Sequence, residues 1–312
     1  MVVNLFLALD VRSLHKRYGD VIAVDGLDLQ VQAGECFGLL GPNGAGKTTT
    51  IEICEGLLAA DSGEVVILGH TWAADAKALR QKLGAQLQES QFADKLTVAE
   101  TLALFRSFYT HGLTVDELIA QVRLEEKRNA RVNQLSGGQK QRLSVACALA
   151  GNPELIFLDE PTTGLDPQAR RQLWELVEGL RDAGKTILLT THYMDEAQRL
   201  CDRVAIVDHG HLIALGTPRE LIQSLGVEQV VECSVAEGQG LAIAALEALP
   251  GVRRAQVEED LHTLQVDAAH ETIPALLTLL EASGLTLTAL RTHSPTLEDV
   301  FVALTGRHLR EA

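Results

Sequence analysis

The chain of 312 residues lacks several features that define common protein classes. No run approaches the roughly 18–20 uninterrupted apolar residues that a membrane-spanning helix needs. The apolar start, Met1 to Leu9, has neither the basic segment nor the length of a signal peptide, so we expect it to lead into a first strand. The five cysteines lie at least 18 positions apart and form no C-x-x-C pair. This spacing favours reduced core thiols in a cytosol over a disulfide framework or a zinc site.

Basic residues are also few. Lys and Arg number 27 against 42 Asp and Glu, which gives a formal net charge of −15. A general field of this sign opposes binding to nucleic acid or to an anionic bilayer, and we expect no nucleic-acid partner. With 46% apolar and 22% charged residues, the composition is that of a globular protein. The length suits one large domain or two ordinary ones.

The composition changes near residue 225. Up to that point the sequence has 22 basic and 29 acidic residues, and beyond it 5 basic and 13 acidic. The last lysine of the chain is Lys185. We therefore expect two domains.

The first part alternates short apolar runs with helical patterns, which is typical of an α/β sheet covered by helices. The clearest strands are residues 36–40, 155–158 and 186–190, whose near-continuous apolar character predicts burial on both faces. Residues 98–109 and 139–150 are predicted helices.

The second part has strands of period two, at residues 231–235, 264–266 and 285–288. Residues 273–280 have helical apolar spacing with Gly284 placed to cap the helix, and residues 241–248 form a weaker helix. If one further short strand is allowed, the order is β-α-β-β-α-β, a small split βαβ domain of α+β type.

Residues 41–48, GPNGAGKT, satisfy the phosphate-binding pattern G-x-x-x-x-G-K-[ST]. The loop follows the strand 36–40 and precedes a helix predicted over about 47–57. Backbone N–H groups and a helix N-terminus would hold the phosphates, and side chains at Gly41, Gly44 and Gly46 would obstruct that approach. Lys47 would neutralise the β and γ phosphates, and the Thr48 hydroxyl would bind Mg²⁺.

The strand 155–158 ends in two acids, Asp159 and Glu160. Asp159 would orient the Mg²⁺ shell, and Glu160 would polarise the attacking water as general base. The alternative is an ordinary solvated loop. Two acids directly after four apolar residues, in the same domain as a phosphate-binding loop, favour the functional interpretation.

Residues 135–139, Leu-Ser-Gly-Gly-Gln, open the predicted helix that runs to residue 150. Two adjacent glycines at a helix N-terminus give a second phosphate-binding end. One nucleotide hardly needs two such ends from one subunit, so this end would complete the site of another copy. Taken alone, the segment would more often be a turn and helix cap.

The segment 135–139, followed by Lys140-Gln141-Arg142, resembles the signature of the ATP-binding cassette (ABC) ATPases, and it lies in the family's order between the P-loop and Asp159-Glu160. The resemblance covers roughly residues 7–222. It implies an α/β ABC domain, with a mixed-sheet core and a helical signature subdomain at about 89–150. The small α+β domain, residues 227–306, would follow as an accessory domain for dimerisation or regulation.

The resemblance also assigns residues. Tyr18, 23 positions before the P-loop, would stack on adenine, and Gln88, which has a competitor in Gln86, would be the Q-loop glutamine. The implied catalytic set is Glu160, His192 and Gln88, and the Mg²⁺ ligands are Thr48, Gln88 and Asp159. Asp166 belongs to the D-loop, where it also begins a helix. The ATP-binding residues are Tyr18, Gly41, Pro42, Asn43, Gly44, Ala45, Gly46, Lys47, Thr48 and Thr49, and the opposite subunit adds Leu135, Ser136, Gly137, Gly138 and Gln139.

In this family two ATP molecules join two cassettes head to tail, and with one P-loop and one signature a homodimer is the simplest closed arrangement. The segment 88–134 would receive a helix of a separate transmembrane permease, which places the chain at the cytoplasmic face of the membrane. Residues 294–301 and 304–307 are similar to the end of ABC-2-type exporter ATPases. Locally they read as an amphipathic helix that packs the terminal domain through Leu297, Val300, Phe301 and Leu304.

The implied function is therefore the ATP-hydrolysing subunit of an exporter. One alternative is a non-transport ABC ATPase acting on ribosomes or DNA, but such proteins usually carry two cassettes, and the acidic charge argues against nucleic-acid contact. A second alternative is a nucleotide-responsive regulator that barely hydrolyses, and the presence of Glu160 and His192 argues against it.

Overall fold

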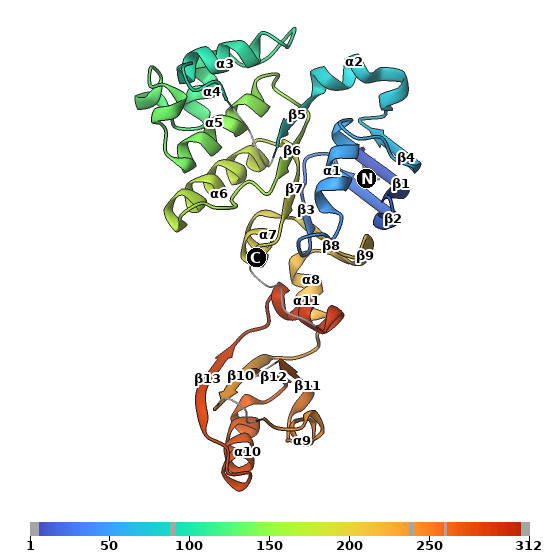
Figure 1. The fold of residues 1–312 in the computed structure, drawn as a ribbon, viewed down its shortest axis with the longest axis vertical. Helices are drawn as coiled ribbons and strands as arrows, with labels where there is room; N and C mark the ends of the chain where they lie inside the picture. The colour runs from blue at the N-terminus through green and yellow to red at the C-terminus, as the bar shows by residue number, and fades with distance from the viewer. Residues whose placement is uncertain (1–5, 88–91, 237–239, 259–260, 307–312) are drawn as a thin grey trace, which may run out of the picture. The chain divides into compact units, whose positions relative to one another are not determined.

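The computed structural model describes residues 6–87, 92–236, 240–258 and 261–306 (Figure 1). The chain divides into two compact units, one up to Pro218 and one from Arg219 onward. Each unit has its own sheets and its own core. The fold is thus the expected α/β cassette followed by a small α+β domain.

A six-stranded mixed sheet forms the centre of the first unit. Its strands are parallel except for the last, which is antiparallel to its neighbour. In spatial order they are β5 (Leu83–Gln86), β6 (Leu155–Asp159), β7 (Thr186–Thr191), β3 (Cys36–Leu40), β8 (Arg203–Asp208) and β9 (His211–Gly216). The three strands predicted from apolar runs are β3, β6 and β7, and all their residues are buried, which confirms the prediction.

A second, antiparallel sheet has the order β2-β1-β4. Its strands are β1 (Leu7–Tyr18), β2 (Val21–Gln32) and β4 (Ser62–Ile67). The expected first strand is β1, whereas residues 1–5 lie outside the described part of the chain. Helix α1 (Lys47–Glu55) lies between the two sheets, and all three share one apolar core (Figure 1).

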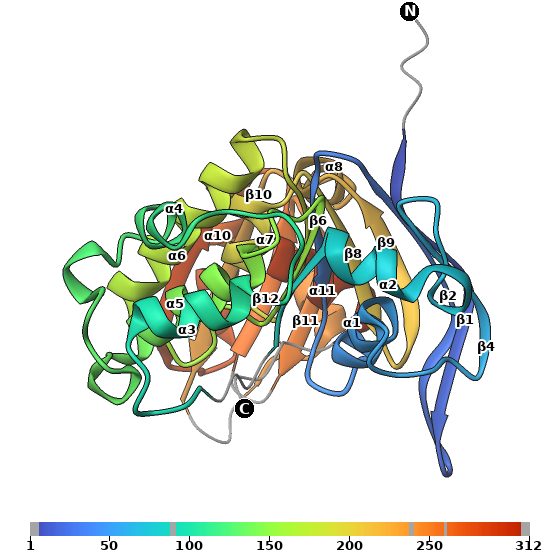
Figure 2. The same cartoon turned by 90° about the horizontal axis from the view of Figure 1, so that it is seen from above.

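Helices α5 (Gly137–Leu149), α6 (Pro167–Asp182) and α7 (Met194–Leu200) lie on the side of the six-stranded sheet away from α1 (Figure 1). Helices α3 (Val98–Arg106) and α4 (Val115–Gln121), with the short 3₁₀ turns Glu125–Lys127 and Val132–Gln134, join α5 in the helical part of the cassette. Figure 2 shows this helical part on one side and β1, β2 and β4 on the other. Helix α2 (Trp72–Lys82) follows β4.

Helix α3 ends three residues earlier than the apolar spacing predicts. The Ser107 hydroxyl donates to the carbonyl oxygen of Leu104 at 2.6 Å, and the Arg106 guanidinium donates to that of Tyr109 at 2.7 Å. The Ser107 bond takes up a carbonyl group in the last turn of the helix and competes with its continuation, and the Arg106 bond holds the chain just beyond the helix.

The second unit has the chain order β10 (Gln229–Val235), α9 (Ile243–Glu247), β11 (Val252–Glu258), β12 (Leu261–Val266), α10 (Ala269–Ala282), β13 (Leu287–His293) and α11 (Leu297–Thr305), preceded by α8 (Pro218–Gln223). The sheet order β11-β12-β10-β13 is that of a split βαβ domain, which confirms the expected topology. Gly284 ends α10 at φ +67°, as predicted. The strand after it begins at Leu287 rather than Leu285, because the Leu285 N–H bonds back to the Leu280 carbonyl as part of the cap.

Helix α11 buries Leu297, Val300 and Phe301, as expected. The prediction for Leu304 is wrong, since this side chain is 48% exposed, and Val302 is buried instead. Side chains of β11 hold the helix in this orientation, because Gln256 and Arg254 donate to the carbonyl oxygens of Val302 and Ala303. Among the described residues no helix is long and apolar enough to cross a membrane.

Candidate active site

The phosphate-binding loop joins β3 to α1, and two of its glycines are required by close backbone contacts. A Cβ on Gly41 would lie 2.2 Å from the carbonyl oxygen of Val207, and one on Gly46 would lie 2.2 Å from that of Ala23. Gly44 has open space but adopts φ +80°. The expectation that side chains here would obstruct phosphate is therefore incomplete, because packing and backbone conformation already demand glycine.

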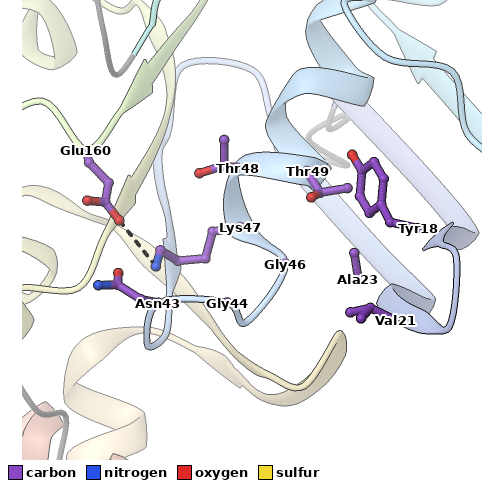
Figure 3. Close-up of a pocket in the computed structure, with 10 residues that line it drawn as sticks. All are labelled: Tyr18, Val21, Ala23, Asn43, Gly44, Gly46, Lys47, Thr48, Thr49 and Glu160. Atoms are coloured by element: carbon purple, nitrogen blue, oxygen red, sulfur yellow. Dashed lines mark ion pairs between the residues drawn. The ribbon is translucent and has the colours of Figure 1, made fainter. Parts of the chain in front are cut away.

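Lys47 occupies the centre of the loop and is only 4% exposed. Its ammonium group donates to the carbonyl oxygens of Gly41 at 2.8 Å and Pro42 at 3.1 Å. It also lies 3.3 Å from Glu160 Oε1 (Figure 3). Burial is the larger effect and lowers the pKa of Lys47 below its usual value, although the neighbouring carboxylates of Glu160 and Asp159 raise it.

Glu160 lies just past the C-terminal end of β6, at φ +44°, a conformation that residues other than glycine rarely adopt. His192 Nδ1 lies 3.2 Å from Glu160 Oε2, and the Thr163 hydroxyl donates to the same oxygen at 3.1 Å. The His192 contact, with Lys47 and Thr163, holds the pKa of Glu160 at about 2, although burial raises it. The structure thus brings together Glu160 and His192, two members of the predicted catalytic set, beside the lysine predicted to hold phosphate.

Asp159 is buried and lies 3.5 Å from the Thr48 hydroxyl. Burial raises the pKa of its carboxyl, and the hydroxyls of Thr190 and Thr48 lower it. A buried carboxylate and a hydroxyl are the hard oxygen donors that Mg²⁺ prefers, and Mg²⁺ usually completes its shell with waters and phosphate oxygens. The pair therefore fits the predicted magnesium site. Thr190, which also bonds the Glu160 N–H at 2.9 Å, was not anticipated from the sequence.

One pocket unites most of the predicted ATP-binding residues (Figure 3). The predicted residues that line it are Tyr18, Asn43, Gly44, Gly46, Lys47, Thr48, Thr49 and Glu160. Gly41, Pro42 and Ala45 belong to the loop without lining the pocket. Tyr18 stands at the end opposite Glu160, half exposed, with Lys16 Nζ 5.6 Å from its ring centroid.

Val21 and Ala23 also line this pocket, although the sequence did not identify them. Val21 pairs with Tyr18 across the turn between β1 and β2. The turn pair Gly19-Asp20 was the signal that could have placed an apolar Val21 beside the predicted aromatic.

The signature residues line a separate pocket in the same unit, together with Asp166. Ser136, Gly138 and Gln139 are the signature residues that line it, whereas Leu135 is buried. Ser136 caps α5, its hydroxyl accepting the Gln139 N–H while the Gln139 side chain accepts the Ser136 N–H. A Cβ on Gly138 would lie 2.6 Å from that of Ala169 on α6. The signature therefore presents a helix N-terminus at a site distinct from the chain's own P-loop.

Asp166 caps α6, its carboxylate accepting the N–H groups of Gln168 and Ala169 at 2.9 Å each. Gln88 lies outside the described residues. Its competitor Gln86 is buried at the end of β5, with Nε2 3.4 Å from the carbonyl oxygen of Asp159.

The family model of the ABC transporter matches residues 24–163, which span the P-loop, the signature and Glu160. A second model, the C-terminal domain of DrrA1-3-like ATP-binding proteins, matches residues 216–305. The chain is 42% identical over 311 residues to a Nod factor export ATP-binding protein I of Ralstonia nicotianae, covering 97% of this chain and 95% of that one. The chain belongs to the ABC transporter family. It is an ATP-binding subunit of the exporter type and an ATPase.

Other relatives agree. A Nod factor export ATP-binding protein I of Sinorhizobium fredii is 40% identical over 310 residues, covering 98% of this chain and 88% of that one. The solved structure of an ATP-binding subunit of an ABC transporter superposes with a TM-score of 0.63 at 31% identity, over 70% of this chain and 93% of that one. The dimeric post-hydrolysis state of an ATP-binding cassette, bound to ADP and Pi, superposes with a TM-score of 0.60 at 28% identity, over 67% and 98%.

Proposed function

We propose that this ABC ATPase powers a separate membrane permease for export, through ATP-driven head-to-tail pairing of two copies at the cytoplasmic face. The observation that carries the proposal is the separation of the two phosphate-binding ends within one chain. The P-loop pocket contains no signature residue, and the signature pocket contains no P-loop residue. An ATP held by Lys47 in one copy would meet Ser136 and Gly138 of the other.

The site residues have distinct proposed roles. Tyr18 stacks on adenine, and Lys47 with the N–H groups of residues 41–49 binds the phosphates. Thr48 and Asp159 hold Mg²⁺, which would neutralise charge developing on the phosphates. Glu160 orients and deprotonates the attacking water, and His192 fixes the Glu160 carboxylate.

The Lys47–Glu160 ion pair links substrate binding to activation of the base. A carboxylate whose pKa is about 2 is a weak base. ATP phosphates that bind Lys47 would neutralise its positive charge. The lysine would then stabilise the Glu160 carboxylate less, and the pKa of that carboxyl would rise. We therefore propose that ATP binding makes Glu160 a stronger base, while the His192 contact, which lowers its pKa most, stays in place.

The proposed permease contact is the exposed apolar face of α3 and the residues around it. Leu104 and Phe108 are exposed, the latter by 61%, and the rings of Phe105 and Phe108 meet edge to face with centroids 5.9 Å apart. Phe92 packs on Phe105 in the same way. Clustered exposed apolar side chains of this kind mark protein contact surfaces. We also propose that residues 7–222 and 227–306 are the two functional domains.

Glu160→Gln tests the proposed catalysis. We expect this variant to bind ATP and to hydrolyse it at least about a hundredfold more slowly, since only the base is lost. Glu154→Gln, at the exposed opposite end of the β6 segment, is the matched control and should turn over normally. Turnover of Glu160→Gln within a few fold of wild type would remove Glu160 from the mechanism.

A further inference from the structure

Helix α7 carries a fully buried glutamate that none of the proposed roles uses. Glu196 is 0% exposed, and its Oε1 accepts a hydrogen bond from the Trp174 indole on α6 at 2.9 Å. Its Oε2 is buried without a hydrogen-bond partner. Buried polar atoms are nearly always paired, so an unpaired carboxyl oxygen here calls for a second arrangement that pairs it.

Two threonine hydroxyls face this carboxyl. Burial raises the pKa of Glu196, and the hydroxyls of Thr191 and Thr162, with the Trp174 indole, lie close enough to lower it, although neither hydroxyl has hydrogen-bond geometry to Oε2. Both threonines are buried, and Thr162 Oγ1 has no hydrogen-bond partner of its own. An unpaired acceptor and an unpaired donor thus share one buried environment.

The two threonines belong to the segments that carry the water-activating pair. Thr191 precedes His192, and its hydroxyl accepts the Tyr193 N–H at 2.9 Å. Thr162 lies in the turn that begins at Glu160, where the Leu165 N–H bonds back to the Thr162 carbonyl at 3.2 Å. Glu196 is therefore next to both turns while its other oxygen is fixed to α6.

We propose that Glu196 is a positioning residue for ATP hydrolysis: its carboxyl couples the turn 160–166 to the turn 191–193, and its free oxygen takes the Thr162 hydroxyl when the catalytic arrangement forms. The inference rests on the proposed roles of Glu160 and His192. Glu196 touches no reacting atom. It acts by fixing the relative position of the carboxylate and the histidine, and small errors in such a position slow catalysis strongly.

The test uses the full-length chain and compares kcat with KM for ATP. Thr162→Val removes one buried hydroxyl without changing side-chain volume greatly, and Glu196→Met removes the carboxyl. We expect kcat to fall about tenfold or more in each, with KM within about twofold. Glu196→Gln keeps an acceptor for Trp174 and offers a donor to Thr162, so it should recover kcat to within about threefold of wild type. The double variant Thr162→Val/Glu196→Met should be no slower than Glu196→Met alone, because the two residues act as one unit.

Thr186→Val is the matched control. Thr186 is a buried threonine at the start of β7 whose hydroxyl accepts the Gly34 N–H at 2.9 Å, away from both turns. A purely structural role of Glu196 would lower the melting temperature but leave kcat per folded molecule unchanged, and Thr162→Val and Thr186→Val would then behave alike. That result, or kcat effects that multiply in the double variant, would overturn the inference.

Two further results separate a failure of the positioning role from a failure to fold and from a failure of the catalytic assignment. If Glu196→Met does not fold, Thr162→Val alone decides, and a folded Thr162→Val with kcat within twofold of wild type overturns the proposal. Glu160→Gln and His192→Ala run in the same assay. If these lose turnover while Thr162→Val does not, only the positioning role fails; if these keep turnover, the proposed catalytic assignment fails first, and the positioning role fails with it.

Discussion

Lys47 Nζ lies 3.3 Å from Glu160 Oε1, with both side chains almost fully buried. The lysine proposed to bind phosphate and the proposed base therefore neutralise each other in the absence of nucleotide. Each is otherwise satisfied by its own neighbours, the P-loop carbonyls for Lys47 and His192 with Thr163 for Glu160. In the proposed mechanism, triphosphate binding would exchange one anionic partner of Lys47 for another, so the positive charge of Lys47 would stay compensated.

The first prediction concerns this ion pair in the protein without nucleotide. Lys47→Met should lower the free energy of unfolding by about 3 kcal/mol, because it leaves the buried Glu160 carboxylate without its cation. Adding Glu160→Gln should restore more than half of the loss. Urea denaturation of the two variants checks this, and unchanged midpoints for Lys47→Met would show that the pair contributes nothing to stability.

A second prediction concerns Glu55, at the end of α1. Both its carboxyl oxygens are buried without a hydrogen-bond partner, and burial, with Asp159 and Glu52 nearby, raises the pKa of Glu55 to about 8. Its folded pKa is above the unfolded value, so the folded state keeps a proton that the unfolded state releases. The free energy of unfolding should therefore decrease as pH rises from about 4.5 to about 8, by up to about 5 kcal/mol.

Urea denaturation across this pH range measures the effect. Glu55→Gln should remove most of the decrease, whereas Glu52→Gln, at a half-buried acid on the same helix, should keep most of it, because burial raises the pKa of Glu55 more than the charge of Glu52 does. Parallel pH profiles for wild type and Glu55→Gln would contradict the assignment.

The third prediction tests the adenine site. Tyr18→Ala should raise the dissociation constant for ATP about tenfold, because base–aromatic stacking contributes about 1–3 kcal/mol. Tyr18→Phe keeps the ring and should bind normally. Titration of both with a fluorescent ATP analogue on the Glu160→Gln background separates binding from turnover. Equal affinities for Tyr18→Ala and Tyr18→Phe would mean that the ring does not hold the base.

The sequence predicted those elements whose pattern is local. The segments that form β3, β6 and β7 are apolar on both faces. Helix α10 has apolar residues at helical spacing and ends at Gly284. The P-loop, the signature and Asp159-Glu160 are contiguous motifs. The P-loop lies beside Asp159-Glu160 because β3 and β6 both end at the same edge of a parallel sheet.

Features that depend on tertiary contacts were not predictable in this way. Three features depend on segments distant in sequence: the burial of Glu196, the contact of the Thr190 hydroxyl with Asp159, and the exposure of Leu304 on α11. The end of α3 depends on side-chain bonds that compete with the helix, and an apolar period does not reveal them.

The proposed head-to-tail dimer is tested most directly at Ser136, the cap of α5. Aspartate and asparagine both cap helices well, so Ser136→Asp and Ser136→Asn should both fold, and they differ in one negative charge. The measurement is the molar mass by light scattering, with Mg²⁺ and ATP, of each variant on the Glu160→Gln background. We expect Glu160→Gln alone and with Ser136→Asn to be a dimer with ATP and a monomer without it. With Ser136→Asp it should stay a monomer with unchanged ATP affinity, because the new charge repels the partner's phosphates. An ATP-dependent dimer of the Ser136→Asp variant, or a monomeric Glu160→Gln protein saturated with ATP, would contradict the composite site.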